Sequence, residues 1–71
     1  MTNTEIIFEV HEAEEGGYWS RALGHDIFTE ADTWEELKEK IRDAVECSFG
    51  EGEERPKMVR LHYVRDEVFA L

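Results

Sequence analysis

Apolar and polar side chains alternate with a period of two in four stretches of the chain, and this pattern predicts β-strands. The predicted strands cover residues 5–13, 18–23, 27–30 and 58–64. In the first strand, Ile6, Phe8 and Val10 form one clearly apolar face. The connections between the first three strands are too short for a parallel crossover, so these strands are expected to form an antiparallel meander.

Glycines mark the turns of this meander. Residues 14–17 read Glu-Glu-Gly-Gly, and paired glycines permit the positive φ angles of tight hairpins. Residues 24–26 form a second predicted turn, and residues 51–57 form a charged loop before the fourth strand. After that strand, residues 65–67 can reverse the chain, so the sequence allows one further short strand over residues 68–71.

Apolar positions spaced three to four residues apart predict one amphipathic helix over residues 34–49. Thr33 and Glu36 have the Thr-x-x-Glu spacing of a capping box, and Gly50 stands where a left-handed C-cap belongs. Glu36 and Lys40 can form an ion pair at i, i+4. The apolar arc of the helix comprises Trp34, Leu37, Ile41, Ala44, Val45, Ser48 and Phe49.

These elements have the order β-β-β-α-β within a single domain over residues 1–71. Strands in one layer and a helix in the other predict a two-layer α+β sandwich with an antiparallel sheet. A single helix covers only one face of that sheet. Ile7, Trp19 and Phe28 are out of phase with their more apolar neighbours, so some of them must lie on the uncovered face. An exposed apolar patch of this kind usually marks a site of association.

The size of the chain and its cysteine count indicate its oligomeric state and its cellular compartment. A domain of 71 residues buries only about 60% of its surface, so a partner subunit is the expected source of extra stability. We therefore predict a homo-oligomer, either a dimer or a tetramer. Cys47 is the one cysteine, which excludes an intramolecular disulfide and suits the cytoplasm. The sequence contains neither a run of about 18 apolar residues nor a secretory leader, so no membrane association is expected.

The charge balance bears on the kind of partner. The chain carries 18 acidic and 8 basic residues, for a net charge of −10. A surface this negative repels phosphate backbones, so direct binding of nucleic acid is not expected. The same surface attracts a basic protein.

A group of acids near the first turn raises the hypothesis of an enzyme. Glu12, Glu14 and Glu15 could hold a magnesium ion, with Glu9 as the best placed carboxylate on an interior strand. This arrangement would make the protein a metal-dependent nuclease. The alternative is an exposed, glutamate-rich turn.

Histidine and cysteine give no further support for catalysis. The spacing of His11, His25 and His62 matches no metal-ligand motif. Cys47 has no identifiable histidine partner. We therefore predict no catalytic, cofactor-binding or metal-binding residue, and no cofactor.

One series of residues resembles the HicB-like family of small proteins. The series is Gly16, Gly17, Tyr18, Ala22, Leu23, Gly24, Thr29, Asp32, Thr33, Trp34, Glu35, Glu36 and Leu37. The resemblance covers about residues 5–49, and Leu23, Gly24 and His25 stand where family members often carry Leu-Pro-Gly.

The resemblance implies a degenerate ribonuclease-H-like fold and a role as the antitoxin of a toxin–antitoxin pair. Such an antitoxin covers a small basic toxin that cuts messenger RNA. Many family members also carry a DNA-binding segment, and we expect none after the strand that ends near Val64.

Together, these observations predict a small acidic protein-binding domain. The expected partner-binding residues are Glu12, Glu14, Glu15, Trp19 and Phe28. The metal-dependent nuclease and a self-associating module without a toxin remain the alternatives.

Overall fold

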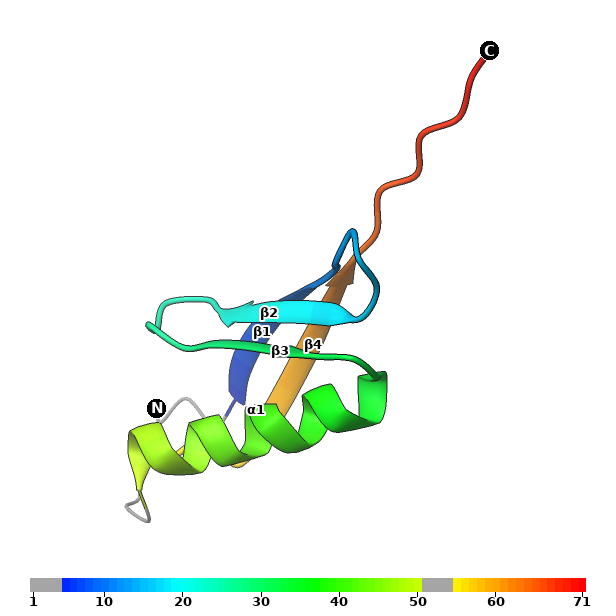
Figure 1. The fold of residues 1–71 in the computed structure, drawn as a ribbon. Coiled ribbons are helices and arrows are strands. Elements are labelled where there is room, and N and C mark those ends of the chain that lie inside the picture. Colours follow the sequence, from blue (N-terminus) through cyan, green and yellow to red (C-terminus); the bar gives the residue numbers. More distant parts are fainter. Residues whose placement is uncertain (1–4, 51–54) are drawn as a thin grey trace.

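A computed structural model of the chain describes residues 5–50 and 55–71, and it has the predicted α+β architecture (Figure 1). The elements are β1 (Glu5–Glu12), β2 (Tyr18–Ala22), β3 (Phe28–Ala31), α1 (Trp34–Phe49) and β4 (Met58–Val64). The predicted order β-β-β-α-β is confirmed, and the bounds of α1 and β4 are those predicted. The predicted bounds of β1, β2 and β3 differ from the observed ones by one residue at one or both ends.

The sheet has the strand order β3-β2-β1-β4. The predicted meander is confirmed, because β2 pairs antiparallel with both β1 and β3. The direction of the last strand was predicted wrongly: β4 pairs with β1 in parallel, so the sheet is mixed. The reason is the helix, since α1 returns the chain to the starting end of the sheet and forms a crossover connection.

The further strand that the sequence allows over residues 68–71 is not formed. Residues 65–71 have no secondary structure and run away from the domain (Figure 1). The predicted turn over residues 65–67 reads Arg-Asp-Glu, and it lacks the glycine that favours a tight hairpin reversal. Part of the predicted charged loop, residues 51–54, lies outside the described residues.

The predicted ends of α1 are confirmed, although Gly50, with a ψ of −149°, does not adopt the predicted left-handed helical conformation. The backbone N–H of Glu36 donates to Oγ1 of Thr33 at 3.1 Å. At the other end, Gly50 has φ of 65° and its N–H donates to the carbonyl of Glu46 at 2.9 Å. The predicted pair of Glu36 and Lys40 is also present, with the charged atoms 3.4 Å apart.

The hydrophobic core lies between α1 and the sheet. Its buried members are Ile6, Phe8, Val10, Ala22, Ala31, Leu37, Ile41 and Val45. On α1 the buried residues are spaced four apart, and Ser48 is exposed, so the buried stripe is narrower than the predicted arc. Trp34 packs against the core, as predicted. The one buried polar side chain among the described residues is Ser20, whose hydroxyl lies 2.6 Å from that of Thr29.

Candidate partner-binding surface

The turn between β1 and β2 holds its acidic residues at the tip of a hairpin. The N–H of Ala13 donates to the carbonyl of Gly17 at 3.0 Å, and the N–H of Gly16 donates back to Ala13 at 3.1 Å. Gly16 and Gly17 have φ of 103° and 81°, which is the left-handed region that glycine adopts without strain. Glu14 and Glu15 are therefore exposed at a closed turn.

A groove of about 600 Å³ lies between this hairpin tip, the end of β3 and the start of α1. Its carboxylates are those of Glu14, Glu15, Glu30, Asp32 and Glu36. Tyr18 and Trp19 supply aromatic surface, and Lys40 is the one cation among the described lining residues. The Lys40 ammonium already contacts two residues of the groove, because it pairs with Glu36 at 3.4 Å and donates to the backbone carbonyl of Glu30 at 3.0 Å. The groove, called the acidic groove below, is therefore strongly negative.

Aromatic side chains form a row on the face of the sheet opposite α1. The rings of His11 and Trp19 stack with their centroids 4.2 Å apart and an angle of 10° between the planes. Trp19 stacks in turn with Phe28, with 5.9 Å between centroids and an angle of 23°. The register places Ile7 on the same face. The prediction that some of the out-of-phase residues lie on the uncovered face is therefore confirmed, and all three lie there. Phe28 is 62% exposed. We call His11, Trp19 and Phe28 the aromatic row.

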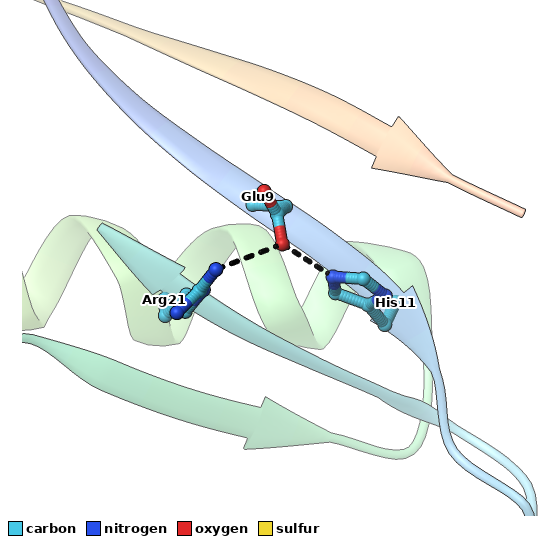
Figure 2. A network of polar contacts seen from close by, with 3 residues as sticks. All are labelled: Glu9, His11 and Arg21. Carbon is cyan, nitrogen blue, oxygen red and sulfur yellow. Dashed lines mark hydrogen bonds and ion pairs between the residues drawn. The ribbon is translucent and has the colours of Figure 1, made fainter. Parts of the chain in front are cut away.

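A polar network orients the first ring of this row (Figure 2). Oε1 of Glu9 accepts a hydrogen bond from Nε2 of His11 at 2.7 Å, and it lies 3.4 Å from Nη2 of Arg21. The hydrogen bond from His11 lowers the pKa of Glu9, and the positive charge of Arg21 acts in the same direction against the effect of partial burial. Glu9 is therefore held ionised, and its bond to His11 fixes the ring on which Trp19 stacks.

The acidic groove and the aromatic row meet at Trp19. Three of the residues predicted for partner binding, Glu14, Glu15 and Trp19, line the groove, and Phe28 lies next to Trp19 in the row. Glu12 lies apart from both: its carboxylate accepts a hydrogen bond from the hydroxyl of Tyr63. This hydrogen bond raises the pKa of Tyr63.

Sequence reasoning identified two of the five carboxylates of the acidic groove and missed the other three. Glu30, Asp32, Glu36 and Lys40 line it beside the predicted residues. Glu30 could have been identified from the sequence, because the alternation of β3 places it on the same face as Phe28. Which residues lie next to the hairpin tip depends on strand register, for example on the pairing of Trp19 with Glu30. The alternation pattern of a single strand does not specify that register.

Among the described residues, no group of three or more His, Cys, Asp or Glu side chains could hold a metal ion. His25 packs edge-on against the ring of Phe49, at 5.2 Å between centroids, and His62 is exposed on β4. Glu9, the carboxylate named for a nuclease, is engaged by His11 and Arg21. No helix in the described part of the chain combines the length and apolar character needed to cross a membrane.

Comparison with known proteins identifies relatives along nearly the whole chain. The chain matches no family model and no solved structure. It is 47% identical over 70 residues to a UPF0150 protein of Thermotoga maritima, an alignment that covers 99% of this chain and 97% of the relative. It is also 60% identical over 53 residues to a UPF0150 protein of Archaeoglobus fulgidus, covering 75% of this chain and 77% of the relative. Identity at this level over nearly the full length means that the chain belongs to the UPF0150 family.

Proposed function

We propose that this chain is a protein-binding domain of the HicB-like antitoxin type, which neutralises a small basic toxin that cuts messenger RNA. It acts by occlusion, covering the surface with which the toxin contacts RNA. The observation that supports this proposal most strongly is the junction of the acidic groove and the aromatic row at Trp19. A cytoplasmic location accompanies this function, because the messenger RNA that the toxin attacks is found there.

The acidic groove supplies the electrostatic part of the interaction. An enzyme that binds RNA must present lysine or arginine side chains to the phosphate backbone. A groove lined by five carboxylates, with one lysine already paired to Glu36, attracts those same cations. The antitoxin and the RNA therefore compete for one surface of the toxin, and a net charge of −10 speeds the encounter at low salt.

The aromatic row supplies the anchor. Trp19 is half-buried and lies between the rings of His11 and Phe28. A side chain held in this way loses little conformational freedom on binding, and tryptophan is common among the residues that dominate binding energy.

The test uses the product of the neighbouring open reading frame, which this proposal expects to be a small basic protein. The purified basic protein is expected to cleave labelled RNA, and this chain is expected to stop the cleavage at equimolar concentration. Trp19→Ala should weaken the complex by about 30-fold or more, the loss typical of a central anchor.

Two double variants distinguish the effect of the acidic groove on binding from the effect of the net charge. Glu14→Gln with Glu15→Gln neutralises two acids of the acidic groove, while Glu39→Gln with Asp43→Asn neutralises two acids on the exposed side of α1. The first pair should weaken binding by about tenfold and reduce its dependence on salt, whereas the second pair should have a much smaller effect. Equal effects of the two pairs, or the absence of any bound basic protein at low salt, would contradict the proposal.

Self-association remains a second prediction for this chain. The nuclease alternative also remains a prediction, although no observation among the described residues favours it. The same RNA assay tests it directly, using this chain alone with magnesium or manganese. Cleavage that is lost in Glu9→Gln would favour the enzyme over the antitoxin.

A further inference from the structure

The segment of residues 65–71 leaves the domain with its apolar side chains uncovered. It follows β4 and runs away from the sheet without secondary structure (Figure 1). Val68 and Phe69 are 95% and 74% exposed, and Leu71 is fully exposed. Three large apolar side chains this close together, uncovered in the described part of their own chain, indicate a surface that becomes buried in an assembly.

A groove that can receive such side chains lies between α1 and β4. Residues of α1 and β4 line its two sides. The side of β4 that faces the helix layer is incompletely covered, since Val59 is 41% exposed there. The resulting groove has a volume of about 290 Å³, and we call it the β4 groove. Its lining residues are Lys38, Ile41, Arg42, Lys57, Val59 and Leu61.

The charges of the β4 groove and of the 65–71 segment are complementary. Three of the eight lysine and arginine residues of this acidic chain line the groove, around an apolar floor. In the segment, Asp66 and Glu67 directly precede Val68 and Phe69. A cationic rim with an apolar floor fits a peptide in which acids stand beside apolar residues.

The geometry favours a second copy over the same copy as the source of this peptide. The β4 residues that line the groove, Val59 and Leu61, lie in the first half of the strand, whereas the segment begins after Val64 and continues away from it. β4 is also an edge strand, so its outer backbone groups can pair with an added strand. A seven-residue segment spans roughly 23 Å when extended, and β4 has the same number of residues.

The side-chain spacing also matches. Residues two apart on an extended chain point to the same side, so Phe69 and Leu71 can enter the groove together. Val59 and Leu61 have the same spacing on β4. Two copies related by a two-fold axis would each donate a segment and each receive one.

We propose that the 65–71 segment of one copy pairs with the edge of β4 in a second copy and places Phe69 and Leu71 in the β4 groove of that copy. The contact is reciprocal and forms a dimer. This inference does not rest on toxin binding, because the β4 groove shares no residue with the acidic groove or the aromatic row.

The first test measures the dimer of the full chain by sedimentation velocity over a range of concentrations. Phe69→Ser combined with Leu71→Ser should raise the dimer dissociation constant by about 30-fold or more. Val68→Ser is the matched control, because Val68 points away from the groove in this arrangement, and it should have a clearly smaller effect. All three positions are exposed in the single copy, so the circular dichroism spectrum of each variant should equal that of the parent chain.

A charge exchange tests both sides of the contact at once. Arg42→Glu and Glu67→Arg should each weaken the dimer by about tenfold. An equimolar mixture of the two variants should recover the dimer, because each of its two contacts then pairs opposite charges. A chain that stays monomeric up to about 1 mM, a dimer that is indifferent to the double serine variant, or a mixture that recovers nothing would each overturn the proposal.

Discussion

Among the glycines in the described part of the chain, Gly17 is the one at which an added methyl group would meet other atoms. Its φ is 81°, and a Cβ added there would lie 2.5 Å from the carbonyl oxygen of Ala31 and 3.1 Å from Cα of Asp32. Both of these atoms belong to the backbone, so they cannot move aside as the end of a long side chain can. Gly17→Ala therefore forces the hairpin tip away from the end of β3.

The expected cost has a conformational part and a steric part. Placing alanine in the left-handed region costs about 1–2 kcal/mol, and forcing extra atoms into a packed contact costs about 1–3 kcal/mol. The alanine also restricts the unfolded chain, which returns about 0.4–1 kcal/mol. We expect Gly17→Ala to lower the free energy of unfolding by about 2–4 kcal/mol.

Gly16→Ala is the matched control for this change. Gly16 also has a positive φ, at 103°, but a Cβ there would meet nothing within 4 Å. This variant should show the conformational cost alone, about 1 kcal/mol. The difference between the two variants isolates the contact of Gly17 with the backbone of Ala31.

Urea unfolding followed by tryptophan fluorescence measures both variants, since Trp19 and Trp34 report on the hairpin and the core. In a domain of this size, 1 kcal/mol corresponds to about 4–8 °C in melting temperature. Gly17→Ala should also weaken binding of the proposed basic partner, because Ala31 lines the acidic groove. Equal unfolding free energies for the two variants would refute the reasoning, since the steric contact would then carry no energy.

Three further predictions concern the core, a buried hydroxyl and acid stability. Leu37→Ala removes a fully buried side chain and should cost about 2–5 kcal/mol in urea unfolding, whereas Leu23→Ala, at a position 43% exposed, should cost less than about 1 kcal/mol. Ser20→Ala should cost about 1–2 kcal/mol, because it leaves the hydroxyl of its partner on β3 without its hydrogen bond. The hydrogen bond from His11 lowers the pKa of Glu9 in the folded chain. The stability that ionised Glu9 contributes is therefore fully present above its ordinary pKa of 4.5, and it is lost as the pH falls through the lower pKa of the folded chain. Glu9→Gln should therefore reduce the acid dependence of the melting temperature below about pH 4.5, and an unchanged profile would exclude this assignment.

The elements that could be predicted from the sequence are those with local signals. The start of α1 depends on Thr33 and Glu36, three residues apart, and its end depends on Gly50 alone. The strand patterns are equally local, because alternation needs only neighbouring residues. The same alternation indicated that some of Ile7, Trp19 and Phe28 lie on the face opposite the helix, and the strand register shows that all three do.

The features that could not be predicted depend on contacts between distant residues. Alternation does not distinguish a parallel from an antiparallel partner, so the pairing of Phe8 with Leu61 in β1 and β4 could not be read from either strand. The acidic groove has the same origin, because Asp32 reaches the hairpin tip only through the pairing of β2 with β3. Residues 68–71 have strand-forming side chains but no neighbouring strand in their own copy, so propensity alone predicted a strand that tertiary contacts do not support.

The face of the sheet opposite α1 carries charged as well as aromatic side chains, and these charges affect what kind of partner can bind there. Glu9 and Arg21 flank the aromatic row, and Arg60 pairs with Glu5 further along the same face. Charged groups between the apolar ones disfavour broad contact between two copies of this face, because burying it would desolvate those charges. A basic partner avoids that cost, since it can anchor at Trp19 while its cations remain near the acidic groove. The proposed contact between two copies lies at the opposite edge of the sheet, where β4 is incompletely covered, so both proposed interactions can occur on one molecule at the same time.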